Sequence, residues 1–161
     1  MDDSPQPRPG EGDGFAFLLV QLGFYVGRQF SERLAPLGLE PRHFGMLIRL
    51  AANEGTSQQA IGELLGLNAT RMVFLVDELE QRGLVERRRN PADRRSYALY
   101  LTEAGRAKLR EAQQASAVQA SQLGASLTEA ERGQLTTLLR RLAEEAGISP
   151  DTIPGPPPGL R

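Results

Sequence analysis

The stretch from Asn68 to Thr102 reads NATRMVFLVDELEQRGLVERRRNPADRRSYALYLT. Its first half predicts a helix, because apolar residues recur mostly at helical spacing between Asn68, a suitable N-cap, and Gly83, a suitable stop. The apolar positions are Met72, Val73, Leu75, Val76 and Leu79. The other face carries Thr70, Arg71, Phe74, Asp77, Glu78 and Gln81. We therefore expect one face of this helix to pack on a core and the other to remain available.

Two short strands joined by a charged turn are predicted after this helix. Residues 84–89 (LVERRR) suit one strand, 90–93 (NPAD) suit a turn, and 94–101 (RRSYALYL) alternate like a returning strand. Five arginines and one acidic residue lie between Arg87 and Arg95, although the formal charge of the whole chain is −1. Phosphate groups are natural partners for such concentrated charge. An isolated charge run usually marks a solvated turn, but this one directly follows a helix-turn-helix pattern.

The helix-turn-helix pattern begins upstream. Pro41 suits the first turn of a helix over 41–52. The expected core face of that helix is Phe44, Leu47, Ile48 and Ala51. Residues 56–59 (TSQQ) match a capping box that opens a short helix, and Gly66 lies in the tight connection to the longer helix. A short helix, a turn with glycine and a longer helix together make a helix-turn-helix.

The remaining segments predict helices at both ends of the chain. Residues 15–34 predict a helix that is apolar on most of its sides. An alanine-rich helix is predicted to begin at Thr102. Residues 128–131 (TEAE) match a capping box, and a final amphipathic helix follows them. We expect 15–40 and 102–147 to form dimerisation helices around a DNA-binding lobe at 41–101. The proline-containing segments 1–14 and 148–161 are predicted to be a disordered lead-in and a flexible tail.

Composition argues against several classes of protein. The absence of cysteine removes disulfides, thiolate nucleophiles and Cys-based zinc sites, and His43 is the only histidine. A hydrolase using Asp93 with His43 is the enzyme alternative, but no nucleophile motif, phosphate loop or metal-ligand spacing supports it. We therefore expect no enzymatic activity, no cofactor and no metal. The apolar run from Phe15 to Val26 is interrupted and too short to span a bilayer, so we expect a cytoplasmic protein.

Three separated motifs together resemble the MarR family of bacterial winged helix-turn-helix regulators. They are LEQRGLVER at 79–87, DRR at 93–95 and LTEAG at 101–105, within a resemblance that covers about 15–146. The resemblance implies a mainly α (α+β) fold, with a small two- or three-stranded wing and dimerisation helices from both ends of the chain. It also implies a homodimeric transcriptional regulator that binds an inverted repeat in double-stranded DNA, acting as a repressor relieved by a ligand.

The resemblance also implies which residues meet DNA. On that model Arg94 inserts into the minor groove, and Asp93 braces Arg95 to shape the wing. The remaining expected contacts are Thr56, Ser57, Asn68, Thr70, Arg71, Phe74, Arg88 and Arg89. The chain departs from the family at Val73 and Phe74, where polar or basic residues commonly face the groove, although Phe74 could touch a thymine methyl group.

Members of this family usually respond to small aromatic or phenolic anions bound between the dimer helices and the DNA-binding lobe. The candidates here are Phe24, Tyr25, Arg28, His43 and Met46. A purely structural role also fits them, because methionine and aromatic residues at helical spacing usually pack in a core. A different alternative for the whole protein is a winged-helix interaction module that does not bind DNA, which would predict a neutral wing.

Overall fold

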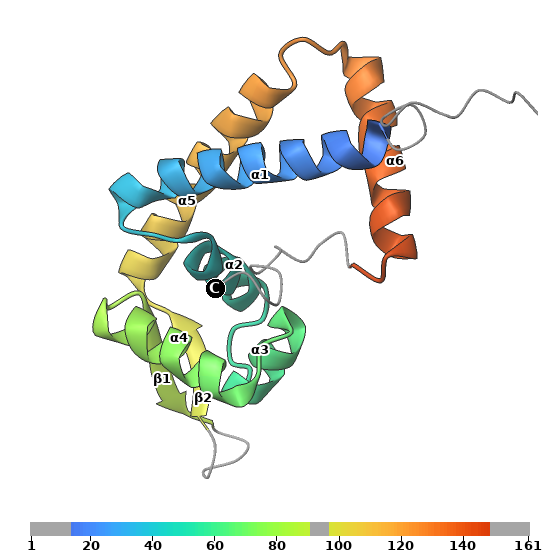
Figure 1. Cartoon of the computed structure of the whole chain (residues 1–161). Helices are drawn as coiled ribbons and strands as arrows, with labels where there is room; N and C mark the ends of the chain where they lie inside the picture. The colour runs from blue at the N-terminus through green and yellow to red at the C-terminus, as the bar shows by residue number, and fades with distance from the viewer. Residues whose placement is uncertain (1–13, 91–96, 149–161) are drawn as a thin grey trace, which may run out of the picture.

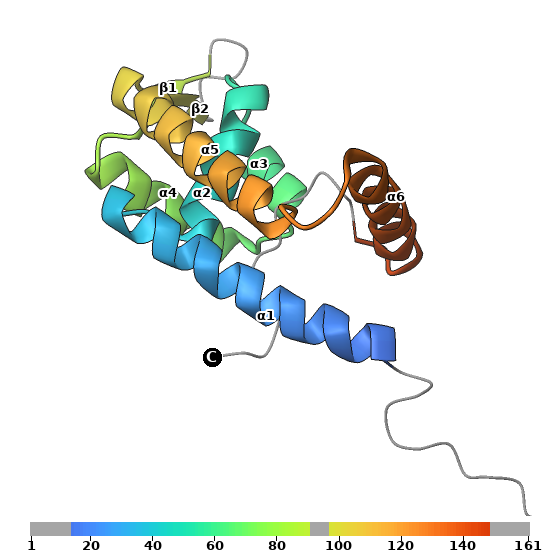
Figure 2. The same cartoon turned by 90° about the horizontal axis from the view of Figure 1, so that it is seen from above.

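The computed structural model describes residues 14–90 and 97–148 of the chain. Helices α2 (Pro41–Ala52), α3 (Gln58–Leu65) and α4 (Ala69–Gln81) form one lobe with strands β1 (Val85–Arg89) and β2 (Tyr97–Leu101). Helix α1 (Gly14–Leu34), the short 3-10 helix η1 (Ala35–Leu37) and helix α5 (Glu103–Leu123) pack next to this lobe, whereas α6 (Glu129–Glu145) stands away from it (Figures 1 and 2). This arrangement confirms the predicted mainly helical fold with a winged helix-turn-helix.

The hydrophobic core lies where α2 meets its neighbours. Helix α2 packs against α1, α3, α5 and β2, and its Met46, Leu47 and Leu50 are fully buried. The predicted core face of this helix is wrong at Ala51, which is exposed, while Ile48 is only partly buried. A single apolar stripe describes a helix that packs on one side, whereas α2 is covered on several sides.

The N-cap of helix α3 lies one residue later than the predicted capping box places it. Its N-cap is Ser57, whose Oγ accepts a hydrogen bond from the Ala60 N–H at 3.2 Å. Thr56 instead donates its hydroxyl to the Asn53 carbonyl, and its own carbonyl accepts the Leu99 N–H at 3.0 Å. The capping box predicted at 56–59 is therefore wrong, because strand β2 holds the backbone of Thr56 in place.

Helix α4 has the start and the end that the sequence predicts. Asn68 Oδ1 accepts the Arg71 N–H at 2.9 Å, and Gly83, just past the last turn, has a φ of 66°. That left-handed conformation favours glycine and ends the helix. The predicted core face is wrong at Val73, whose side chain is 42% exposed next to Phe74 on the free side of the helix.

The wing is an antiparallel hairpin. Val85 lies opposite Leu101 and Arg89 lies opposite Tyr97. An isolated bridge between Ser57 and β2 adds a short contact to this two-stranded sheet. Most of the predicted turn and the first residues of the predicted second strand fall at 91–96, outside the described residues.

The helices at the two ends expose large apolar side chains. Phe15, Phe17 and Phe24 of α1 are 64%, 63% and 66% exposed. The exposed leucines of α6 are Leu135, Leu138, Leu139 and Leu142. Surface of this kind marks sites of association in soluble proteins. The flanking segments predicted to be disordered lie almost wholly outside the described residues, and no helix within 14–90 and 97–148 is long and apolar enough to cross a membrane.

Candidate nucleic-acid interface

The N-terminal turn and free face of α4 are exposed beside the wing (Figure 1). Asn68, Thr70 and Arg71 are exposed in the first turn of the helix, and Phe74 is 70% exposed one turn later. Free N–H groups and the helix dipole make such a turn favourable for anions. The structure thus places these four predicted residues along one end of the same helix.

The two predicted residues before α3 are less free. Ser57 is half-buried and its Oγ caps α3, while the half-buried Thr56 hydroxyl is used within the preceding turn. Both residues stabilise the loop that leads into the helix-turn-helix. A DNA contact from either would have to be made in addition to these hydrogen bonds.

Arg87 joins the wing to the helix-turn-helix, a role that the sequence analysis missed. Its guanidinium lies 2.5 Å from Asp77 Oδ1 and 3.2 Å from Gln58 Oε1, and it also pairs with Glu80. The Arg87 side chain is only 20% exposed. This arginine neutralises two carboxylates that would repel phosphate, and it fixes the first strand of the wing against α3 and α4.

The next two arginines lie further along the same strand. The Arg88 guanidinium lies 4.6 Å from the centre of the Tyr100 ring and pairs with Glu86, yet its side chain is 59% exposed. Arg89 is exposed opposite Tyr97. Both cations therefore remain accessible from solvent. Asp93, Arg94 and Arg95 lie outside the described residues, so their roles stay predictions.

Glu54 connects the other side of the wing to α5. Its carboxylate accepts the Leu101 N–H at 2.8 Å and pairs with Arg106 at 2.6 Å. Burial raises the pKa of Glu54, but the hydrogen bonds from Arg106 and from the Leu101 N–H outweigh burial and leave that pKa below its usual value. The charged carboxylate thus helps to hold β2 between α2 and α5.

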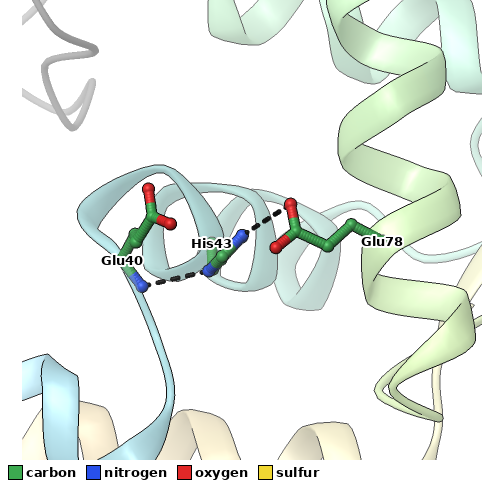
Figure 3. Close-up of side chains that lie close together, drawn as sticks. All are labelled: Glu40, His43 and Glu78. Carbon is green, nitrogen blue, oxygen red and sulfur yellow. Dashed lines mark hydrogen bonds and ion pairs between the residues drawn. The ribbon is translucent and has the colours of Figure 1, made fainter.

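A buried histidine joins α2 to α4 (Figure 3). His43 is 1% exposed, and its Nδ1 accepts the Glu40 N–H at 3.0 Å. Its Nε2 lies 3.1 Å from Glu78 Oε2. Contact with His43 is the main cause that lowers the pKa of Glu78, with help from the charges of Arg42 and Arg82.

These contacts favour a structural role for the cluster of Glu40, His43 and Glu78. Its ligand atoms lie close enough together for a metal ion. However, the Glu40 N–H uses the Nδ1 lone pair of His43, which assigns the proton of the neutral ring to Nε2, the nitrogen that faces Glu78. Arg42 already supplies a cation to both carboxylates, at 3.1 Å and 3.3 Å. The cluster therefore serves to fasten α4 to α2.

The five candidate ligand residues do not meet in one pocket of the single chain. Met46 is fully buried in the core and His43 is held in the cluster just described. Phe24, Tyr25 and Arg28 lie on exposed parts of α1, where Arg28 is 3.9 Å from Glu32. His43 and Met46 are buried within the lobe, whereas the other three lie on exposed α1, so a shared role of these five residues in ligand binding stays a prediction.

A cavity of about 300 Å³ lies instead between α1 and α5. The lining residues are Tyr25, Val26, Gln29, Arg33, Gln119, Gln122 and Leu123. Arg33 contacts Gln122 Oε1, and its buried Nε has no hydrogen-bond partner in the described part of the chain. Tyr25, Gln29 and Arg33 recur every four residues, so helical spacing could have identified this face.

An exposed helix beside a cationic hairpin, both fixed to one core, defines a winged helix-turn-helix protein of the DNA-binding class. A family model described as "MarR family" matches residues 37–96. The chain is also 34% identical over 141 residues to a Thauera aromatica protein named for regulation of the hcr operon, with 83% of this chain and 85% of that protein covered. The chain therefore belongs to the MarR family of transcriptional regulators, as its motifs predict.

Solved structures agree with this assignment. The transcriptional repressor CouR bound to a 23-mer DNA duplex is 33% identical, with a TM-score of 0.75 over 87% of this chain and 99% of that chain. CouR from Rhodococcus jostii RHA1 bound to p-coumaroyl-CoA is 30% identical, with a TM-score of 0.69 over 85% of this chain and 96% of that chain. The family is one of transcriptional regulators, not of enzymes.

Proposed function

We propose that the chain acts in the cytoplasm as a homodimeric repressor that binds an inverted repeat in double-stranded DNA and is released by a small ligand. The observation that carries this proposal is the exposed face of α4 beside an arginine-rich wing, which Arg87 fixes to that helix. The similarity to CouR, a repressor solved on a DNA duplex, supports it. The alternative, a protein interaction module without DNA binding, predicts a neutral wing, whereas Arg88 and Arg89 of β1 are exposed cations.

In this proposal the lobe at 41–101 binds DNA, and the segments 15–40 and 102–147 form the dimer. Asn68, Thr70 and Arg71 approach phosphates or base edges at the start of α4, and Arg88 and Arg89 face the backbone from the wing. Ser57 and Thr56 hold the loop before α3 within reach of the duplex. Arg94 enters the minor groove, and Asp93 braces Arg95.

Arg94→Ala is expected to weaken DNA binding at every salt concentration and to reduce the slope of log affinity against log salt by about 1. The physical reason is that each cation on a phosphate releases counterions from the duplex. Fluorescence anisotropy with a duplex selected by the protein from a random pool measures both quantities. Arg28→Ala removes the same charge from an exposed position on α1 and serves as the control. An unchanged affinity and slope for the Arg94 variant would argue against its insertion into the minor groove.

We propose further that the ligand is a phenolic acid carried as its coenzyme A thioester, and that its aromatic group enters the cavity between α1 and α5. Tyr25 offers an aromatic wall there, and the unpartnered Nε of Arg33 offers a donor to a carbonyl oxygen. The support from similarity is CouR, which has been solved with p-coumaroyl-CoA. Of the residues predicted from sequence, only Tyr25 remains in this site.

Arg33→Ala is expected to abolish release by the ligand while leaving DNA affinity without ligand nearly unchanged. A coupling of roughly 1 to 3 kcal/mol corresponds to about 5- to 150-fold release in the wild type. The release of DNA is measured by adding p-coumarate, salicylate or p-coumaroyl-CoA to the complex of the protein with the selected duplex. The wild type and the Arg33 and Arg28 variants are compared. Equal release in the wild type and the Arg33 variant would place the ligand elsewhere, and loss of release only in the Arg28 variant would assign the cation to Arg28.

A further inference from the structure

The free face of α4 carries an apolar patch where it would meet a base pair. Val73 is 42% exposed and Phe74 is 70% exposed, so most of the surface of Phe74 is open to solvent. Thr70 precedes this pair by one turn on the same face, and Asp77 follows it by one turn. We call Val73 and Phe74 the apolar patch of α4.

Hydrogen-bonding side chains are scarce around this patch. The carboxylate of Asp77 is held by Arg87 at 2.5 Å, and Arg82 donates to the Gly38 carbonyl and lies 3.4 Å from His43 Nδ1. Arg71 is the single cation within α4 itself. The middle of the helix therefore cannot form the two-point hydrogen bonds by which arginine, asparagine or glutamine identify guanine and adenine.

The surroundings of the patch select its partner. Arg71 lies at one end of it, and the exposed Arg88 and Arg89 lie on the wing beside the same helix. A partner that fits must combine negative charge at the edges with an apolar group at the centre. The DNA major groove does so, because phosphates border it and the C5-methyl group of thymine is the apolar feature of its floor.

We propose that Val73 and Phe74 recognise C5-methyl groups of pyrimidines, whether those of thymine or of 5-methylcytosine. This inference rests on the proposed function, in which α4 enters the major groove. It goes further, because it requires a pyrimidine C5-methyl group at one position of each half-site. If that pyrimidine is a cytosine, the affinity for the duplex then depends on cytosine methylation.

The size of the effect follows from the area that one methyl group buries. About 0.8 kcal/mol per buried carbon corresponds to about fourfold in affinity. A two-fold dimer repeats the contact in the second half-site, so removing both methyl groups is expected to weaken binding about 15-fold.

The test uses the full chain and a duplex that it selects from a random pool. Each thymine of one half-site, and then of both, is replaced by deoxyuridine, which removes only the methyl group. One position per half-site is expected to lose about fourfold in the wild type. At that position a C·G pair should bind about fourfold better with 5-methylcytosine than with cytosine. Deoxyuridine in the flanking DNA is the matched control.

The protein variants assign the effect to the patch. Phe74→Ala should bind the thymine duplex more weakly than the wild type and respond little to deoxyuridine, whereas Phe74→Leu should keep part of the response. Because Phe74 is exposed, both variants should unfold at the same temperature as the wild type, which circular dichroism checks. Sensitivity to deoxyuridine that persists in both Phe74→Ala and Val73→Ala would overturn the inference.

Two other outcomes separate this inference from the function on which it rests. A selected duplex that the wild type binds equally well with thymine and with deoxyuridine at every position would overturn methyl recognition and leave DNA binding intact. Failure to select any duplex would overturn both.

Discussion

Leu138→Glu is expected to separate the two subunits and to lower the affinity for an inverted repeat by at least about 100-fold, because the second half-site is then no longer bound by a linked partner. Leu135, Leu138, Leu139 and Leu142 follow one face of α6, and each is between 40% and 46% exposed in the single chain. A carboxylate placed in a buried seam loses its hydration without gaining a partner. Analytical ultracentrifugation measures the subunit mass, and anisotropy measures the affinity.

The exposure of α6 in the single chain allows loss of the dimer to be distinguished from unfolding. No described residue of this helix is buried in the chain itself, so the Leu138 variant should keep its helical content as a monomer. Thr137→Glu adds the same charge to the opposite side of α6 and should leave the dimer intact. A wild-type chain that sediments as a stable monomer would contradict the dimer, and with it the inverted repeat.

Gly105→Ala is expected to reduce the free energy of unfolding by about 3 kcal/mol, the upper end of the usual cost of overpacking. A Cβ at Gly105 would lie 2.0 Å from the Leu84 carbonyl oxygen and 2.9 Å from its carbon. Leu84 cannot easily move, because that oxygen accepts the Thr102 N–H at 3.1 Å. Thr102 also caps α5 by accepting the Gly105 N–H at 2.9 Å. The wing and α5 would both have to shift.

The matched control for this variant is Gly133→Ala. Gly133 lies inside α6, and a Cβ there would meet no heavy atom within 4 Å. Its replacement should leave stability unchanged or raise it by up to about 1 kcal/mol, since alanine favours a helix. Urea unfolding at one fixed protein concentration compares the two variants. Equal stability of the Gly105 and Gly133 variants would show that the contact between α5 and Leu84 is not tight.

Local chemistry explains what the sequence predicted well. Asn68, Thr102 and Thr128 each cap the helix that follows, because a cap is decided by a few neighbouring residues. The LTEAG motif has the same kind of explanation, with Thr102 as the cap and Gly105 at the close approach to the wing. Helices, strands and their order were therefore predictable from the chain alone.

Contacts between distant segments explain what the sequence missed. Arg87 looks like its arginine neighbours until β1 folds beside α4 and brings it to Asp77. Ala51 and Leu50 both suit the inside of a helix, and only the packing of neighbouring elements around α2 decides that Leu50 is buried and Ala51 is not. The cavity at Arg33 likewise needs α5 beside α1. These are consequences of tertiary packing, which helical spacing alone does not specify.

The central claim is that two copies of this chain read an inverted repeat with paired copies of α4. The most direct test lets the full chain select duplexes from a random pool. The selected duplexes are then sequenced, and the mass of the protein–DNA complex is measured. The account predicts one enriched inverted repeat with half-site centres about 10 base pairs apart and two chains per duplex. It also predicts that inserting about 5 base pairs between the half-sites, half a helical turn, abolishes tight binding. No enriched sequence, or equal affinity for the original and the lengthened repeat, would contradict it.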